Sequence, residues 1–246
     1  MATPPERTSG QISPDGYWMW DGAQWVPNPY RPLAAPPPTV PYESAGPRAG
    51  IAAILIYASI AGIVLLTAAS VAIDAVPNAS DNLAVSALAL VALLVWLGTL
   101  VAAIVLFCMW LHRIVRNMPA LGAPDPRLSP ARAVVYCFIP IVFWVHPLWS
   151  VLDAWRGADS SRRWLDRSTR RTLRAPQSIV WWWVAWLAGN YITNIGSRFN
   201  GSAGVVFDVI GSAGQIAAAV LVVMVIRDVT ARQERKNELI TSGQLV

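Results

Sequence analysis

The side chains best suited to chemistry are few, and their spacing matches no familiar catalytic or metal-binding pattern. The two histidines, His112 and His146, have no paired carboxylates at ligand spacing. The chain also lacks a Gly-x-Ser-x-Gly turn and a phosphate-binding loop. Cys108 and Cys137 lie in apolar runs, where cysteine usually serves as a small buried hydrophobe. We therefore expect a protein that is not an enzyme, with no catalytic residue, no metal and no cofactor.

Three polar residues in otherwise apolar runs are candidates for an intramembrane site. Asn190 and Asn194 are four residues apart and so share one helix face, and Asp208 lies near the outer end of the last expected span. Polar side chains at membrane depth are costly and often mark the path of a solute. Arg198 is close enough in the chain to neutralise Asp208. An ion pair combined with amide bonds between helices is therefore the other interpretation.

A tryptophan-rich segment near the N-terminus predicts a small β-hairpin. Its sequence, GYWMWDGAQWVP, places an Asp-Gly pair between two aromatic stretches, which is the strongest short signal for a hairpin. A two-residue turn would set Trp18 opposite Trp25, with Trp20 on the same face. These three indoles form a candidate partner-binding surface, which could accept a polyproline segment. A self-packed or disordered tail is the alternative.

The composition indicates an integral membrane protein. Of its 246 residues, 55% are hydrophobic and 13% are charged, against about a quarter charged in an ordinary soluble domain. A helix needs about 20 apolar residues to cross the hydrocarbon core. Five uncharged runs approach or exceed that length: 49–73, 82–111, 133–152, 175–197 and 209–226.

Positive charge is distributed very unevenly between the ends of these runs, and short cytoplasmic loops are where Lys and Arg accumulate. If all five runs cross the membrane and the N-terminus is cytoplasmic, eight Lys and Arg residues lie in the cytoplasm and eleven lie outside. If run 133–152 instead enters and leaves the membrane on the same side, eighteen lie in the cytoplasm and one lies outside. Pro140 and Pro147 in that run would also interrupt a helix. We therefore predict four spans, a re-entrant fifth segment and both termini in the cytoplasm. An ordinary kinked fifth span is the alternative.

The net charge of +5 lies beside the apolar runs, so the expected partner is the anionic inner leaflet and not nucleic acid. The stretch 156–174 holds seven arginines and is predicted to lie on that leaflet as an interfacial helix. A solvated basic loop is the alternative. Lys236 is the only lysine, which we attribute to compositional bias without a mechanism.

The end of the second apolar run carries a distinctive motif, WLHRIVRNMPALG. Trp110, Arg113 and Asn117 recur at three and four residues and so share one helix face, which Arg116 is expected to join. The helix should end before Pro119, and a glycine then permits a turn. Farther along, a Ser-Pro pair is predicted to cap the start of a helix.

This motif and the residues after it resemble the bacterial membrane family called domain of unknown function 4328. The matching positions are Trp110, Arg113, Asn117, Leu121, Gly122, Ser129, Pro130, Phe138, Ile139, Pro140, Pro147 and Trp155. The family usually has asparagine where Phe143 stands and arginine where His146 stands. The resemblance covers roughly residues 49–229 and implies a multi-pass membrane domain without supplying an activity.

The sequence thus predicts an all-α transmembrane protein of the bacterial cytoplasmic membrane, with a small N-terminal β-hairpin. Its parts are a tail with the hairpin (1–27), a proline-rich linker (28–48), a multi-pass transmembrane domain (49–229) and a polar cytoplasmic tail (230–246). The expected function is membrane-anchored binding, sensing or scaffolding, with a possible protein partner at the tryptophan-rich hairpin. A small-solute channel or transporter is the alternative.

Overall fold

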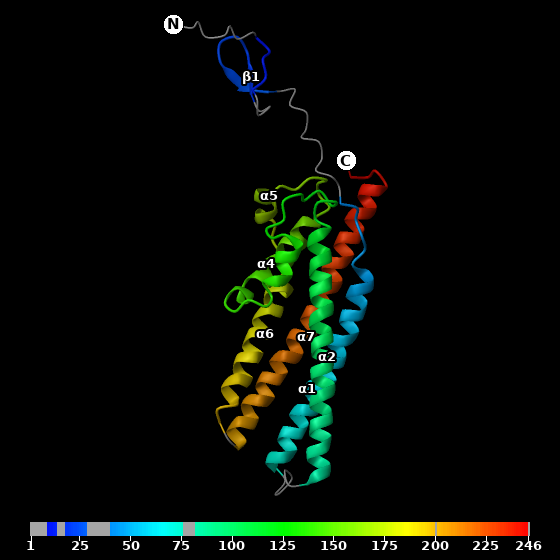
Figure 1. Ribbon diagram of the computed structural model, residues 1–246, viewed down its shortest axis with the longest axis vertical. Coiled ribbons are helices and arrows are strands. Elements are labelled where there is room, and N and C mark those ends of the chain that lie inside the picture. Colours follow the sequence, from blue (N-terminus) through cyan, green and yellow to red (C-terminus); the bar gives the residue numbers. More distant parts are fainter. Residues whose placement is uncertain (1–8, 14–17, 29–39, 76–81, 200, 246) are drawn as a thin grey trace. The chain divides into compact units, whose positions relative to one another are not determined.

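The computed structural model describes residues 9–13, 18–28, 40–75, 82–199 and 201–245. It divides into two compact units, Met1–Thr39 and Val40–Val246. The first contains a small antiparallel sheet and the second is almost entirely helical (Figure 1). Most of the predicted proline-rich linker, and residues 76–81 between the first two apolar runs, lie outside the described residues.

The first unit forms the predicted hairpin but not in the predicted register. Strands β1 (Trp18–Trp20) and β2 (Trp25–Pro27) are antiparallel, with Trp20 opposite Trp25 and Trp18 opposite Pro27. The expected two-residue turn, which would pair Trp18 with Trp25, is wrong. Asp21 explains the longer turn, because one of its carboxylate oxygens accepts hydrogen bonds at 2.8 Å from the backbone N–H groups of Ala23 and Gln24.

Strand β1 is paired on both of its edges. On the side away from β2, Ile12 forms a bridge with Met19. The backbone of Gly10 donates to the carbonyl of Trp20 at 2.8 Å, and Ser13 donates to that of Trp18 at 2.9 Å. A lone two-stranded ribbon is marginal in water, so this third segment adds stability to the module.

The second unit is built on two long helical hairpins. The first consists of α1 (Gly46–Ala75) and α2 (Leu83–Arg116), and the second of α6 (Gln177–Gly196) and α7 (Ser202–Thr241). Figure 1 shows both hairpins turning at the same end of the unit. The four other helix ends lie at the opposite end, which we call the charged end.

Three of the described helices are long and apolar enough to cross a membrane, namely α1 over Gly46–Ile73, α2 and α7. Helix α6 is 20 residues long but contains four tryptophans and two asparagines. These residues lower its mean hydropathy, so α6 is not among the three. The prediction of long apolar helices is confirmed, and the fourth span stays a prediction.

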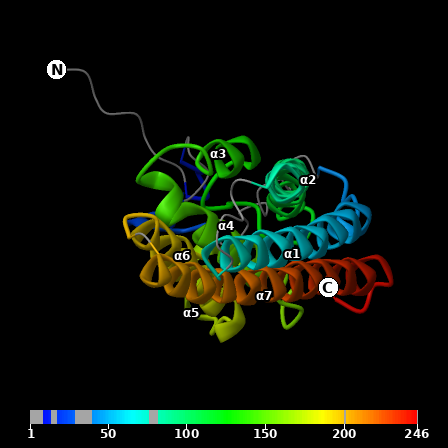
Figure 2. The ribbon, with the colours of Figure 1, turned by 90° about the horizontal axis from the view of Figure 1, so that it is seen from below.

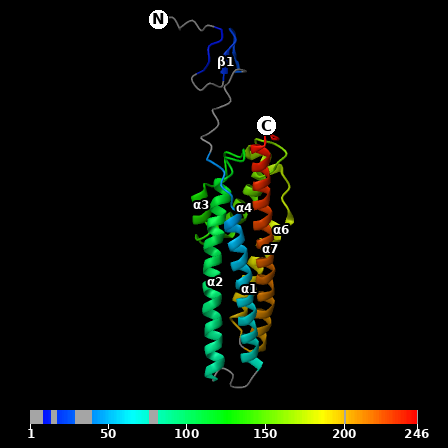
Figure 3. The ribbon, with the colours of Figure 1, turned by 90° about the vertical axis from the view of Figure 1, so that its right-hand side faces the viewer.

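Helices α1 and α7 lie side by side in the middle of the unit, with α2 against α1 and α6 against α7 (Figures 2 and 3). Glycines bring α6 and α7 together. A Cβ added to Gly189 would stand 2.8 Å from the backbone nitrogen of Gln215, and one on Gly211 would stand 2.9 Å from that of Thr193. Small residues therefore set the close approach of this pair.

The outward face of the hairpins is aliphatic. On α2 most exposed side chains are leucine or valine, and Leu88 and Leu94 are 71% and 59% exposed. Exposed apolar surface of this extent requires a cover. Lipid is the cover that suits helices of this length.

The third apolar run is broken, as its prolines predict. Helix α3 (Pro130–Val135) is followed by turns, a short 3-10 helix η2 (Val142–Trp144) and α4 (His146–Gly157). Pro140 lies within the break, whereas Pro147 lies in the first turn of α4, where proline is tolerated. Only Pro140 therefore plays the predicted helix-breaking role. Ser129 caps α3 as expected, since its Oγ accepts from the backbone of Arg132 at 3.4 Å.

The interfacial helix predicted over residues 156–174 is wrong. Within this stretch α4 ends at Gly157, a loop follows, and α5 (Arg167–Thr172) has only six residues. Leu165 and Arg170 are buried in the protein. Tertiary contacts thus replace the continuous lipid-facing stripe that the sequence suggested.

Candidate functional site

At the charged end, a set of buried polar contacts joins α2, α4, α5 and the last four turns of α7. We call it the polar cap. Most of the predicted family-motif residues lie in or beside it, together with several residues that the sequence did not single out.

Trp110, Arg113 and Asn117 share a buried face of α2, as predicted. Trp110 is fully buried, and its Nε1 donates to Thr230 Oγ1 on α7 at 3.0 Å. Arg113 forms an ion pair with Glu43, in the segment before α1. Arg116 does not join this face, because its side chain is exposed.

Asn117 connects three parts of the polar cap. Its Nδ2 donates to the carbonyl oxygen of Glu43 at 2.8 Å, and its Oδ1 accepts from the Glu43 backbone at 3.3 Å. Nδ2 also lies 3.3 Å from Gln233 Oε1 on α7. Gln233 in turn donates to the carbonyl of Ile114 at 2.9 Å. Asn117 thus ties the end of α2 to α7 and to the chain entering α1.

Gly122 holds the loop before α5 against the end of α2. It has a φ of +79°, and an added Cβ would stand 1.8 Å from the carbonyl oxygen of Arg163. Its own carbonyl accepts from the backbone of Leu165 at 2.9 Å. The neighbouring Leu121 is fully buried. Only glycine fits this combination of backbone angle and close contact.

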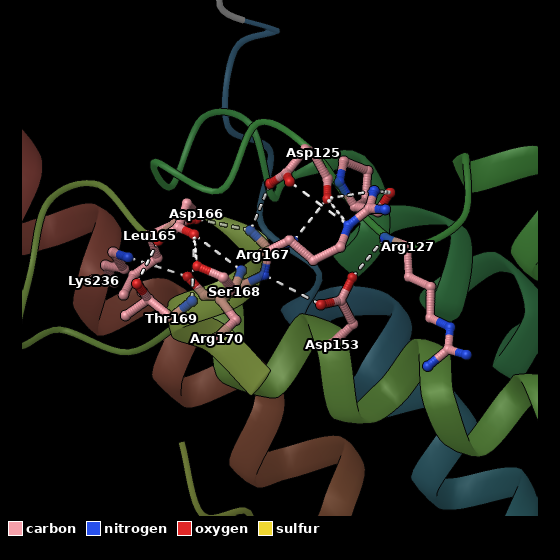
Figure 4. A network of polar contacts seen from close by, with 12 residues as sticks. Asp125, Arg127, Asp153, Leu165, Asp166, Arg167, Ser168, Thr169, Arg170 and Lys236 are labelled. Carbon is pink, nitrogen blue, oxygen red and sulfur yellow. Dashed lines mark hydrogen bonds and ion pairs between the residues drawn. The ribbon is translucent and has the colours of Figure 1, made fainter. Parts of the chain in front are cut away.

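A buried arginine stands at the centre of the contacts in Figure 4. The Nη1 of Arg170 is 2.9 Å from Asp125 Oδ1, and its Nε is 3.1 Å from Asp153 Oδ1. Nη1 also donates to the Leu165 carbonyl at 2.8 Å, and Nη2 to that of Asp125 at 2.7 Å. In the sequence, Arg170 is only one of the seven arginines of the stretch 156–174. Nothing in its local sequence distinguishes it from the exposed arginines around it.

The second half of α7 presents two polar faces that the sequence analysis missed. Thr230 and Gln233 meet α2, while Asp228, Arg232 and Lys236 meet α4 and the loop after it. The spacing of three and four residues within residues 228–236 is the signal that could have revealed these faces. The polar segment after residue 229 is thus helical as far as Thr241.

The face toward α4 is anchored by Trp155, the last family-motif residue. Its Nε1 donates to Asp228 Oδ2 at 2.6 Å, and the guanidinium carbon of Arg232 lies 3.9 Å from its ring centroid. Lys236 is fully buried and donates to the carbonyl of Gly157 at 3.1 Å. The only lysine therefore has a structural role, which corrects its attribution to compositional bias.

Near the opposite end, the three candidate intramembrane residues are not brought together. Asn190 and Asn194 are both exposed, and Asn190 Nδ2 donates to the carbonyl of Trp186 in its own helix at 2.7 Å. Asp208 accepts from Ser70 Oγ at 3.4 Å. Within the described parts of the chain, Asp208 forms no ion pair with Arg198, so that expectation is wrong.

In the N-terminal unit, Trp18 and Trp25 line a shallow hollow together with Ser13. The rings of Trp20 and Trp25 meet edge to face, with centroids 5.6 Å apart. Trp18 is 46% exposed. The rings of Trp20 and Trp25 thus pack against each other, while the ring of Trp18 is partly exposed to solvent.

A protein metal site usually gathers several His, Cys, Asp or Glu side chains. Among the residues that the structure describes, no group of three or more His, Cys, Asp or Glu side chains is placed to hold a metal ion. Asp125 and Asp153 of the polar cap instead pair with the buried Arg170.

Long apolar helices with a polar cap at one end define a helical protein of the membrane type. A family model described as Domain of unknown function (DUF4328) matches residues 74–231. This match covers more than half of the chain, so the chain belongs to that family, and the predicted resemblance is confirmed. No match was found among curated proteins or among solved structures.

Proposed function

We propose that the protein is a membrane-anchored binding protein whose tryptophan-rich module captures a protein partner at the cytoplasmic face of a bacterial inner membrane. The observation that carries this proposal is the exposed Trp18 beside the Trp20–Trp25 pair on a strand-supported ribbon. Exposed indoles in a small folded module are costly in water and are enriched where proteins bind one another.

The proposed membrane architecture has four spans, with α6 as the fourth. Helix α6 has 20 residues, the length that a hydrocarbon core requires. It also packs antiparallel along α7, which is apolar enough to span. The broken segment between α3 and α4 would then enter and leave on one side. Its flanking helices α3 and α4 both contact α2, and α4 also contacts α6.

The proposed orientation places the charged end, and with it both termini, in the cytoplasm. The stretch 156–174 lies at this end and carries seven arginines, whereas the connection between α6 and α7 carries Arg198 alone. Retention of arginine on the cytoplasmic side supports this orientation.

The proposed partner presents a proline-rich segment to the hollow lined by Trp18, Trp25 and Ser13. Polyproline helices dock between aromatic rings because their extended backbone is already ordered before binding. The exposed face of Trp18 gives such a segment a flat apolar surface. A solute path through Asn190, Asn194 and Asp208 receives no comparable support, because these side chains do not share a site.

Site-specific photocrosslinking in native membranes tests the partner proposal. A photoreactive amino acid replaces Trp18 in one variant and Trp164 in a control, because Trp164 is similarly exposed but belongs to the helical unit. We expect a discrete protein adduct from position 18 that position 164 does not give. Absence of an adduct at position 18, or the same adducts from both positions, would contradict the proposal.

A deletion complements this test. Removing residues 1–39 takes away the first unit while keeping Glu43, whose contacts with Arg113 and Asn117 belong to the helical unit. The truncated protein should insert into the membrane and lose the partner. A shortened chain that still co-purifies with the partner would exclude the module as its binding site.

A further inference from the structure

A basic hollow lies where α4, α5 and the loop before α3 meet. Helix α4 contributes one face with residues at positions 149, 152, 153 and 156, and α5 contributes positions 167 and 171. The loop supplies position 127. The complete lining is Arg127, Trp149, Leu152, Asp153, Arg156, Arg167 and Arg171.

Positive charge in the hollow exceeds the negative charge beside it. Four guanidinium groups and one carboxylate line it. That carboxylate, Asp153, is already engaged, since it accepts from Arg170 Nε at 3.1 Å and from the backbone of Arg127 at 2.7 Å. Among the described residues, the side chains of Arg127, Arg156 and Arg171 form no ion pair with an acid.

Several of these arginines are held in place while keeping donors available. The guanidinium carbon of Arg127 lies 3.6 Å from the centroid of the Trp149 ring. Arg156 Nε donates to the carbonyl of Leu173 at 3.0 Å. Arg167 Nη2 donates to the carbonyls of Asp125 at 3.2 Å and Pro126 at 3.1 Å, and its Nε lies 3.6 Å from Asp125 Oδ2. Stacking fixes Arg127 and one backbone contact fixes Arg156 without using all five N–H groups of either guanidinium.

The crowding of like charges has an electrostatic cost. Burial and then the positive charge of Arg171 lower the pKa of Arg127, and Arg167 adds to this effect, while Asp153 opposes it. A bound anion would relieve this repulsion. The hollow is therefore better suited to an occupied state than to an empty one.

We propose that the basic hollow binds a phosphate group. Paired guanidinium N–H groups match the spacing of phosphate oxygens and form charge-assisted hydrogen bonds with them. Trp149 and Leu152 supply an apolar wall for the carbon attached to the phosphate. Helix α4 begins directly after the exposed Trp144 and Val145, so the head group of an anionic lipid can reach the hollow as readily as a free phosphate.

The test uses the full-length protein and a charge-matched pair of variants. R127Q combined with R171Q removes two guanidinium groups from the hollow. R162Q combined with R174Q removes two exposed arginines from the same region that do not line it. One experimental arm measures binding of phosphatidic acid and phosphatidylglycerol in nanodiscs by native mass spectrometry. The other measures binding of inorganic phosphate in neutral nanodiscs at constant ionic strength.

We expect the R127Q/R171Q protein to bind at least about tenfold more weakly than the wild type, because two charge-assisted contacts are lost. The R162Q/R174Q protein should bind like the wild type. Binding in the lipid arm alone assigns the site to a head group, and binding of inorganic phosphate assigns it to a free anion. Equal weakening in both variants, or no phosphate-dependent binding in either arm, would overturn the proposal.

Discussion

Asn117 links three segments of the helical unit within the polar cap. Its side-chain amide forms hydrogen bonds with the backbone of Glu43 and with the side chain of Gln233, and the residue is fully buried. Removing one partner from such a network leaves the others buried without hydrogen bonds. That loss is more costly than the loss of an exposed bond.

We predict that Asn117→Ala destabilises the helical unit by about 1–3 kcal/mol, because donors and acceptors around the site become unsatisfied. The thermal midpoint of the full-length protein in detergent measures this effect. Asn194→Ala is the matched control, since Asn194 is exposed. A midpoint lowered equally by both substitutions would show that the buried network is not responsible.

Gly122 supports a second prediction, which separates steric exclusion from backbone strain. Gly122 and Gly243 have similar φ angles, +79° and +72°, but a Cβ on Gly122 would collide with the Arg163 carbonyl while Gly243 has open space. Gly243→Ala should cost about 1 kcal/mol, the penalty of the left-handed region. Gly122→Ala should cost clearly more and should expose the loop before α5 to protease.

The protease pattern provides the decisive comparison for Gly122. Cleavage in residues 158–166 should increase in the Gly122→Ala protein and remain unchanged in the Gly243→Ala protein. Similar stability and similar cleavage in both variants would mean that the Gly122 contact with Arg163 does not hold the loop.

At the level of elements, α5 is stabilised by an acid at its N-terminus. Asp166 accepts hydrogen bonds from the side chains of Ser168 and Thr169 and from their backbone N–H groups. These side-chain bonds, followed by the backbone bonds, hold the pKa of Asp166 well below its ordinary value of 3.8. The carboxylate form is therefore favoured in the folded protein.

We predict that α5 loses stability in acid through this residue. Because the folded-state pKa is depressed, the contribution of Asp166 is complete above the unfolded pKa and is lost as the pH falls below it. The hydrogen-exchange protection factors of residues 167–172, corrected for the intrinsic exchange rate at each pH, should therefore fall in acid in the wild type. Asp166→Asn, which retains a capping side chain without a titratable group, should show a weaker pH dependence. Identical pH profiles would contradict this role.

The elements that local chemistry determines could be predicted from the sequence. The long apolar helices, the cap formed by Ser129 and the break near Pro140 follow from composition, capping preference and missing backbone donors. The hairpin was predictable, but its register was not, because the Asp21 carboxylate stabilises a longer turn.

The polar cap could be predicted only in part. The shared face of Trp110, Arg113 and Asn117 follows from helix periodicity. Their partners come from segments seventy or more residues away in sequence, which no local pattern identifies. Arg170 and Lys236 became recognisable only after folding placed them among acids and carbonyl groups.

At the scale of the whole molecule, the helical unit has a polar end and an aliphatic body. The family match over residues 74–231 includes most of the polar cap. Glu43, Gln233 and Lys236 lie outside that match but complete the cap through their contacts. The unit that folds together therefore extends beyond the matched region on both sides.

In the proposed orientation, the charged end faces the cytoplasm and the α6–α7 connection lies outside. A cysteine-free background with Cys108 and Cys137 replaced by alanine allows one cysteine to be introduced at a time. Ser160 is exposed at the charged end, and Ser202 is exposed at the start of α7. With a membrane-impermeant maleimide, Ser202→Cys should label in intact cells and Ser160→Cys only after permeabilisation. Labelling of Ser160→Cys in intact cells would contradict the proposed orientation.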